Sequence, residues 1–431
     1  MSLPTQPGMC PVAHGSPTRA GDRRVPLFTP EFAADPHSVY RDMRRHRGPY
    51  VPIELAPGVP ATLVIGYRAA LTILHDEARF PADPSEWARR CPPDSPLLEM
   101  LGPRDNALRK AGREHLRYRA PLSCLETVDR LRLEGVVDRH AERLINARCG
   151  SGAMDLRHDY ALPLTFSVLS ELMGFPADVA ATAYRGMAAI LEGTEDAAQG
   201  GQDFVAAIGE VVAAKRRSPG TDLTSQMIVH PERLGDLEVI QSAALLFAAG
   251  TEPTTNLVLN TVWLSLIDER FAGGVISGTL QTADAVDEVL FTDPPLANFC
   301  VTYPRRRLWI EADDYWLPAH EPVVISLTAC NNDPAIARAG MDRTGNRSHL
   351  SWGAGPHACP AKQVALTIAL RMLDLLFDAL PEMRLAIPSH ELLWRPGPFH
   401  RAPMMLPVEF APTAPMALAA PPLSVPTRPH L

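Results

Sequence analysis

One long stretch with almost no charge constrains the fold of this chain more than any other feature. Residues 237–269 read LEVIQSAALLFAAGTEPTTNLVLNTVWLSLIDE, and apart from Glu252 the charged residues stand near its ends. A helix that is apolar on all sides has to run through the interior of a protein. Pro253 has no backbone N–H to bond to Ala249, so it opens or bends a helix at this point. The stretch therefore predicts a large helical core with a special site at the centre of its longest helix.

Length and composition fit one large domain with a sizeable core. The chain has 431 residues, of which 46% are hydrophobic. The formal net charge of -8, with no basic block, argues against nucleic acid as a partner. No run approaches the roughly 20 apolar residues of a membrane span, and the first residues lack the apolar core of a secretory signal. Seven scattered cysteines without a CxxC pair are typical of reduced thiols, so we expect a cytoplasmic protein without a membrane span.

The pattern along the chain predicts a folded domain at 26–410 between two tails. Residues 1–25 are polar and rich in Pro and Gly, and residues 411–431 are rich in Pro and Ala, so both are expected to be disordered. Helical periodicity fills most of 104–270 and returns after residue 360, and strand-like segments lie within 51–65, 296–330 and 406–410.

A single cysteine stands in an unusual setting near the end of the domain. The segment SWGAGPHACPAKQVAL, residues 351–366, places Cys359 before Pro360 and an apolar-periodic run, which is how a helix begins. A helix N-terminus lowers the pKa of a thiol. Gly353 and Gly355 lack a Cβ, so the loop can lie flat against a large planar group. The loop favours a metal-ligating thiolate, with a structural cysteine and a thiolate nucleophile as alternatives.

This loop resembles the heme-binding signature of the cytochromes P-450, Phe-Gly-x-Gly-x-His-x-Cys-x-Gly. The positions are filled here by Trp352, Gly353, Gly355, His357, Cys359 and Ala361. The likeness covers roughly residues 30–410 and is to the soluble actinobacterial type. It implies a mainly α, helix-rich single domain with small β-sheets, a long central I helix and the cysteine loop before the L helix. It also implies heme b as cofactor, contacted by Trp352, Gly353 and His357, with Cys359 as the ligand of the iron.

The segment REHLRYRAPLS resembles the C helix of that family. The likeness implies that His115 and Arg119 bind the heme propionates, with His357 as a third partner. Their spacing of four residues puts both side chains on one helix face, as two neighbouring carboxylates need. Without the likeness, His115 and Arg119 would be interpreted as part of a solvated face.

The segment AAGTEPTTN resembles the oxygen-binding centre of the I helix, Ala-Gly-x-(Asp/Glu)-Thr-Thr. Gly250 then lies at the heme, and Glu252 matches the acid. Pro253 stands where the first threonine is expected, and Thr254 follows it. We therefore expect Glu252 and Thr254 to be catalytic. The alternative is a packing kink, which leaves a carboxylate in an apolar centre without a purpose.

The segment AVDEVLFTDPP departs from the family's Glu-x-x-Arg motif in the K helix. Glu288 is in place, but Phe291 stands where the arginine belongs. A buried charge that loses its partner is costly, so Glu288 needs another cation, for which Arg343 is a candidate. The chain resembles a group of actinobacterial members that lack this arginine and carry Glu-Pro-Thr in the I helix.

The likeness implies a heme-thiolate monooxygenase. Such an enzyme inserts one atom of dioxygen into an apolar small organic substrate and takes electrons from a ferredoxin and its reductase. The alternative is a heme-binding sensor with little turnover, linked to a small-GTPase signalling partner, which would use the same heme ligands. The substrate is not evident from the residues.

Overall fold

The computed structural model describes residues 24–93, 95, 97–192, 197–272, 281–336, 343, 346–380 and 382–417. Within them the chain is mainly helical, as expected. The helices are α1 (Pro30–Ala34), α2 (Pro36–Arg47), α3 (Tyr67–Leu74), α4 (Ser85–Ala88), α5 (Leu97–Leu101), α6 (Gly112–Arg119), α7 (Arg130–Asn146), α8 (Leu162–Leu172), α9 (Ala177–Glu192), α10 (Ala197–Arg217), α11 (Leu223–Val229), α12 (Asp236–Ile267), α13 (Glu269–Ala272), α14 (Thr282–Thr292), α15 (Leu327–Asn331) and α16 (Lys362–Ala379). The strands are β1 (Val25–Pro26), β2 (Tyr50–Ala56), β3 (Val59–Val64), β4 (Ala153–Asp155), β5 (Asn298–Thr302), β6 (Leu308–Ile310), β7 (Tyr315–Leu317), β8 (Val323–Ser326), β9 (Arg384–Leu385) and β10 (Pro407–Glu409).

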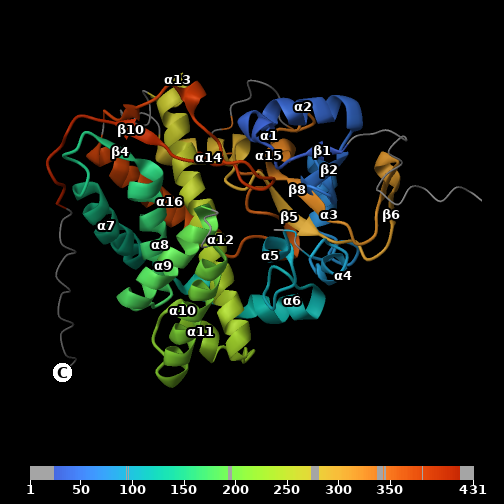
Figure 1. Ribbon diagram of the computed structural model, residues 1–431, viewed down its shortest axis with the longest axis horizontal. Coiled ribbons are helices and arrows are strands. Elements are labelled where there is room, and N and C mark those ends of the chain that lie inside the picture. Colours follow the sequence, from blue (N-terminus) through green and yellow to red (C-terminus); the bar gives the residue numbers. More distant parts are fainter. Residues whose placement is uncertain are drawn as a thin grey trace, which may run out of the picture.

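The long helix α12 confirms the prediction made for 237–269. It runs through the helical half of the molecule, on the left of Figure 1, and contacts α8, α10, α14 and α16. Pro253 lies inside the helix without ending it. Most of its side chains from Thr251 to Ser265 are buried, because neighbouring helices cover α12 on several sides. The helix therefore forms the axis on which the helical core packs.

A five-stranded sheet forms the other half of the molecule, on the right of Figure 1. Its strand order is β1-β2-β3-β8-β5, with β1 parallel to β2, β3 parallel to β8, and the other neighbours antiparallel. The strands predicted within 51–65 are β2 and β3, joined at Gly58, whose φ of 73° suits a tight turn. The predicted strand at 406–410 is β10, which pairs with β4 and β9. Apolar clusters cover the five-stranded sheet.

The ordered domain is longer than predicted at both ends. Val25 pairs with Ile53 in the sheet. Near the other end, Asn146 of α7 exchanges two hydrogen bonds with the backbone of Met416, at 2.8 and 2.9 Å. The predicted tail boundaries were therefore wrong for residues 24–25 and 411–416, because sheet pairing and a side-chain amide hold these residues. Residues 1–23 and 418–431 of the two predicted tails lie outside the described residues.

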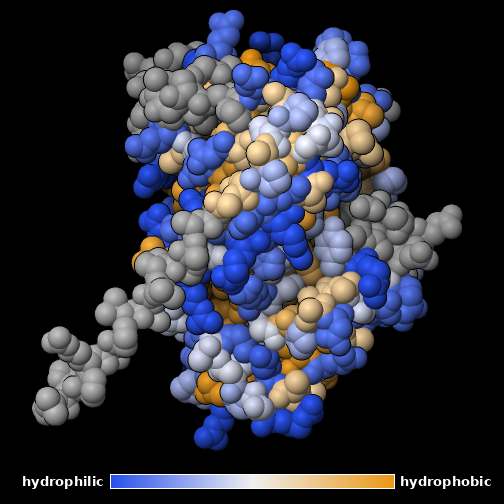
Figure 2. All heavy atoms as spheres, turned by 90° about the vertical axis from the view of Figure 1, so that its left-hand side faces the viewer, coloured by the Kyte–Doolittle hydropathy of each residue, from blue (hydrophilic) through white to orange (hydrophobic). Residues whose placement is uncertain are grey.

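The surface carries polar and apolar side chains side by side. Figure 2 shows hydrophilic and hydrophobic residues interspersed over one face. Among the described residues, no helix combines the length and the apolar character needed to cross a bilayer.

The carboxylate of Glu288, in α14, forms ion pairs with arginines outside its own helix. Glu288 Oε1 lies 3.3 Å from Arg270 Nη2 and 4.0 Å from Arg343 Nη1. The Arg343 guanidinium also lies over the Phe291 ring, 5.2 Å from its centre, and His349 packs edge-on against the same ring. Arg343 was the partner expected from the sequence, and this pairing is confirmed. Phe291 is only 2% exposed, so the space of the usual arginine is filled.

We predict that Phe291→Arg destabilises the protein. A second guanidinium would be buried beside Arg343 without room to relax, which costs about 3–5 kcal/mol of unfolding free energy. Urea unfolding measures this value, and Phe291→Leu, which keeps an apolar group, serves as the control with a loss of about 1–2 kcal/mol. An arginine variant as stable as the unmodified protein would show that this site still accommodates the usual ion pair.

Candidate functional site

The cysteine loop, residues 351–361, leads into α16. A short turn covers Gly355–His357, and the Cys359 N–H donates to the Trp352 carbonyl at 2.8 Å, which closes the loop. The first helical residue is Lys362, after Ala361 at the N-cap. The prediction that Pro360 opens the helix was therefore wrong by two residues, and Cys359 stands before the helix.

The environment of the Cys359 thiol differs from the expectation. Burial raises the pKa of this thiol, and a hydrogen bond from the Ala361 backbone and the charges of Arg119 and Lys362 oppose the rise only in part. The prediction that the helix start lowers the pKa of Cys359 was wrong for the free thiol. Burial raises this pKa by more than the neighbouring helix start lowers it. A metal ion bound to the sulfur reverses this balance, since a coordinating thiol loses its proton.

The two glycines of the loop are needed for its backbone conformation and its close packing. Both have left-handed conformations, with φ of 67° at Gly353 and 68° at Gly355. A Cβ on Gly355 would lie 2.1 Å from the carbonyl oxygen of Leu74, at the end of α3. The absence of this side chain is thus required by contact with α3, whereas the sequence had suggested contact with a planar group. The contact fixes the loop against the segment that follows α3.

The structure brings three predicted cofactor-binding residues together. The rings of His115 and His357 lie 4.0 Å apart, and the Arg119 charge acts on both rings. Glu77 joins them, with Oε1 3.2 Å from His357 Nε2 and 3.7 Å from His115 Nδ1. We call these four residues the histidine cluster. Burial, with the neighbouring His357, lowers the pKa of His115 to about 4, and neither of its buried ring nitrogens has a hydrogen-bond partner among the described residues.

The helix that carries His115 and Arg119 is anchored to the start of α12. Arg117 donates to both carboxylate oxygens of Glu238, at 2.6 and 2.8 Å, and the Tyr118 hydroxyl donates at 2.7 Å. Glu238 also accepts a hydrogen bond from the Gly235 N–H at 2.7 Å and so caps α12. One carboxylate therefore holds α6 in position against the central helix.

One face at the middle of α12 is open. Ala248 and Ala249 are exposed although they lie near the centre of a helix packed in the core. Gly250 does not belong to this open face, because a Cβ there would lie 2.9 Å from Leu169 of α8. Thr254 follows Gly250 by four residues and so shares the face that packs on α8, and it is 5% exposed. The catalytic role expected for Thr254 and the cofactor contact expected for Gly250 stay predictions, and the missing Cβ of Gly250 allows close packing of α12 on α8.

Glu252 is buried, 4% exposed, and surrounded by cations. Arg395 donates to its Oε1, Asn256 donates to the same oxygen at 3.1 Å, and Arg157 lies 3.8 Å from Oε2. Burial raises the pKa of Glu252, but the positive charge of Arg395, followed by His400 and Arg157, brings it below its usual value. The carboxylate is therefore ionised at neutral pH and held between three distant parts of the chain.

Sequence reasoning missed Glu77, Arg157 and Arg395. A buried carboxylate at position 252 demands a cation, and this is the one signal that pointed to the two arginines. No such signal pointed to Glu77. The chain has 41 Lys and Arg residues, however, and their order along the chain does not show which of them face Glu252. Tertiary packing brings Arg157, at the start of a helical segment, and Arg395, in the C-terminal segment, within reach of Glu252.

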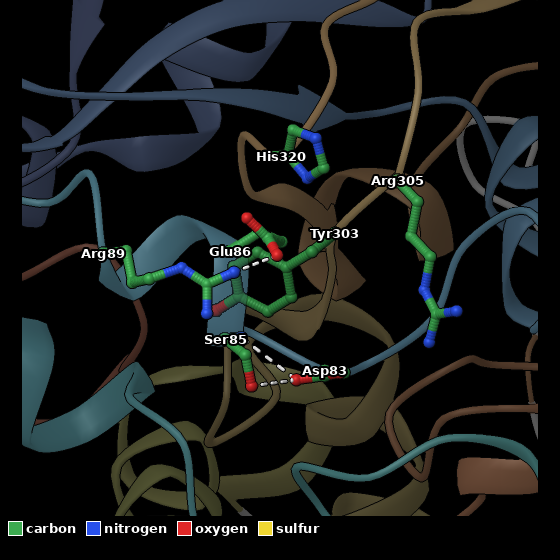
Figure 3. A pocket seen from close by; sticks show the side chains of 7 residues that line it. All are labelled: Asp83, Ser85, Glu86, Arg89, Tyr303, Arg305 and His320. Carbon is green, nitrogen blue, oxygen red and sulfur yellow. Dashed lines mark hydrogen bonds and ion pairs between the residues drawn. The ribbon is translucent and has the colours of Figure 1, made fainter.

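A hollow of about 280 Å³ lies apart from this site. Figure 3 shows its lining: Asp83, Ser85, Glu86, Arg89, Tyr303, Arg305 and His320. Glu86 pairs with Arg89, and the Ser85 hydroxyl donates to Asp83 at 2.6 Å. Several polar groups that line the hollow are thus paired with one another. The hollow shares no residue with the histidine cluster or the cysteine loop.

The residues around Cys359 fit a bulky, anionic metal cofactor. The thiol supplies a soft ligand, and Arg119 makes no ion pair among the described residues. The buried Trp352 Nε1 and both His115 ring nitrogens lack partners in the same part of the chain. Exposed alanines line an open face of α12. A helical fold with these features defines the class of heme-thiolate proteins.

The comparisons with known proteins identify the family. The chain is 30% identical over 367 residues to cytochrome P-450 105C1 of a Streptomyces species, covering 81% of this chain and 88% of that one. It is also 30% identical over 380 residues to the mycinamicin IV hydroxylase/epoxidase of Micromonospora griseorubida, covering 81% and 90%. The structure of CYP154C4 from Streptomyces sp. W2061 matches with a TM-score of 0.79 at 27% identity, covering 90% and 98%. No family model matches the chain.

The chain belongs to the cytochrome P-450 family, and it has the predicted fold. Its class is that of the heme-dependent monooxygenases, which are oxidoreductases that act on small organic molecules with the help of redox partners. The relatives named above give no support to a sensor linked to a small GTPase. The narrower likeness to a group without the K-helix arginine stays a prediction, as does the cytoplasmic location.

We predict that the Glu238 anchor stabilises the fold in a pH-dependent way. The hydrogen bonds from Arg117 lower the pKa of Glu238 from 4.5 to about 2. Because the folded-state pKa is the lower one, the stabilisation is complete above about pH 4.5 and is lost as the pH falls toward 2. Glu238→Gln should therefore cost about 1–2 kcal/mol at pH 7.

Urea unfolding of both proteins between pH 7 and pH 3 checks this. The difference in unfolding free energy between the unmodified protein and Glu238→Gln should shrink below pH 4.5. A difference that stays constant with pH would contradict the role given to the carboxylate charge.

Proposed function

We propose that the chain inserts one oxygen atom from dioxygen into an apolar small organic substrate. The observation that carries the proposal is Cys359, held in a closed loop beside Arg119, His115 and His357. The open face of α12 at Ala248 and Ala249 is apolar, which favours an apolar substrate. When bound, heme with a thiolate ligand supplies the activation of dioxygen.

The roles of the binding residues follow from their chemistry. Cys359 would hold the iron, and the Ala361 N–H with the charges of Arg119 and Lys362 favours the thiolate form of its sulfur. Arg119 and His115 would bind propionates, because their donors have no other partner among the described residues. Trp352, with its free indole N–H, and Gly353 complete the loop on the side of Cys359.

We predict that Cys359→Ala abolishes the thiolate-type Soret band of the reduced, carbon-monoxide-bound protein. The band depends on the sulfur ligand, so its loss identifies Cys359 as that ligand. Cys300→Ala is the matched control, because the Cys300 sulfur lies 3.5 Å from the position of a Cβ on Gly353 and so borders the same loop. The control should keep the band. A purified wild-type chain that binds no heme would refute the proposed function.

Glu252 would handle a proton for the reaction. Pro253 offers no hydroxyl at the position of the usual threonine, and Glu252 is a titratable group within one helical turn of the exposed Ala248 and Ala249. It is ionised at rest, so it accepts a proton before it can donate one. Arg395, which is 21% exposed, reaches it from the C-terminal segment and keeps its charge in place.

We predict that Glu252→Gln lowers product formation by roughly two orders of magnitude, within the range that a positioned acid or base contributes. Heme content should not change. The fraction of reducing equivalents that ends in product, instead of in hydrogen peroxide, measures the effect.

Asp236→Asn is the control for Glu252→Gln. It makes the same kind of change at the exposed start of the same helix. Unchanged coupling in Glu252→Gln would remove the proton role from this residue.

Electrons would arrive from a ferredoxin-type partner at the outer face of α6. A hollow of about 760 Å³ there is lined by Arg113, Glu114, Leu116, Arg117, Arg119, Ala120 and Glu232. Leu116 is 65% exposed. Arginines around an exposed apolar residue suit an acidic protein partner. The Arg119 charge acts on Cys359, so a protein docked in this hollow would lie near the thiolate.

A further inference from the structure

Glu77 is a carboxylate where the cofactor's own carboxylates are expected. It lies in the turn after α3, and the contact of Gly355 with the Leu74 carbonyl holds this turn against the cysteine loop. Glu77 Oε1 is 3.2 Å from His357 Nε2 and 3.7 Å from His115 Nδ1. The centres of the two histidine rings lie 4.0 Å apart, and the ring planes are tilted by 32° to each other. Glu77 therefore faces both histidines at once.

The basic residues of the histidine cluster differ in whether they have a hydrogen-bond partner within the chain. His357 uses Nε2 for Glu77 and also makes a hydrogen bond with the backbone of Ala107. His115 has no hydrogen-bond partner at either nitrogen among the described residues, and the Arg119 guanidinium interacts with its neighbours there through charge alone. Two of the three basic residues are thus available to an anion, and the third is already bound by a carboxylate of the chain itself.

A single N–H group donates one strong hydrogen bond, and two carboxylates close together repel each other. An anion that enters the cluster either displaces Glu77 from His357 or receives no hydrogen bond from this histidine. In either case the charge of Glu77 opposes the anion.

We propose that Glu77 is a positioning residue that competes with a heme propionate for His357 and so limits how firmly the cofactor is held. The inference rests on the proposed function, since it takes heme as the anion. Removing the carboxylate frees His357 for the propionate and relieves the repulsion. Glu77→Gln removes the charge but keeps an acceptor oxygen, and Glu77→Ala removes both.

The test is the rate at which the heme-loaded protein gives up its heme to an excess of heme-free myoglobin. Glu77→Ala should release heme several-fold more slowly than the unmodified protein, with Glu77→Gln in between. Glu114→Gln is the matched control, because it neutralises an exposed carboxylate next to His115, whose ion pair in the described part of the chain is with Lys110 at 3.9 Å. It should release heme at the unmodified rate. All variants should keep the thiolate-type band, which shows that the site is folded.

A double-mutant cycle with His357→Ala separates competition from a general effect of charge. In the His357→Ala background, the effect of Glu77→Ala should become smaller, because the contested group is gone. An effect of full size in that background, or heme release from Glu77→Ala at or above the unmodified rate, would overturn the proposal while leaving the monooxygenase assignment intact. A chain that takes up no heme would overturn both.

Discussion

The ionised carboxylate of Glu252 inside an apolar helix is the constraint on which the arrangement around the site depends. Burial of a charge without partners is costly enough to unfold a domain. Arg157 comes from an earlier and Arg395 from a later part of the chain, and Asn256 adds a hydrogen bond from one turn further along α12. The start of the helical core, the central helix and the C-terminal segment are thereby joined at one point. The same point borders the open face of α12, so stability and chemistry share one ion-pair network.

A similar compensation operates at the K helix. The chain lacks the usual arginine, and Arg270 and Arg343 supply the charge that Glu288 needs. Arg343 also covers Phe291, so one guanidinium serves both the carboxylate and the aromatic ring that fills the vacated space. The departure from the family motif is therefore compatible with a stable fold. It changes which segments are held together, and not whether the charge is paired.

Local patterns were reliable where chemistry depends on neighbours in the sequence. The nearly uncharged stretch at 237–269 predicted α12. The resemblance placed His115, Arg119 and His357 in one cluster, and the structure confirms that they meet. Predictions from single features of the cysteine loop were weaker. The direction of the thiol pKa shift and the role of Gly355 depend on burial and on Leu74, which lies far away in the sequence.

The amino-acid sequence alone determined the helical class, the central helix, the cysteine loop and the residues that share a helix face. These properties depend on spacings of a few residues, which the order of the chain specifies directly. Tertiary structure decided which arginines neutralise Glu252 and Glu288, that Gly250 packs against Leu169 of α8, and that Glu77 enters the histidine cluster. The physical reason is that charges and close contacts act through space. Many residues of the right type compete for each position until packing brings one of them within reach.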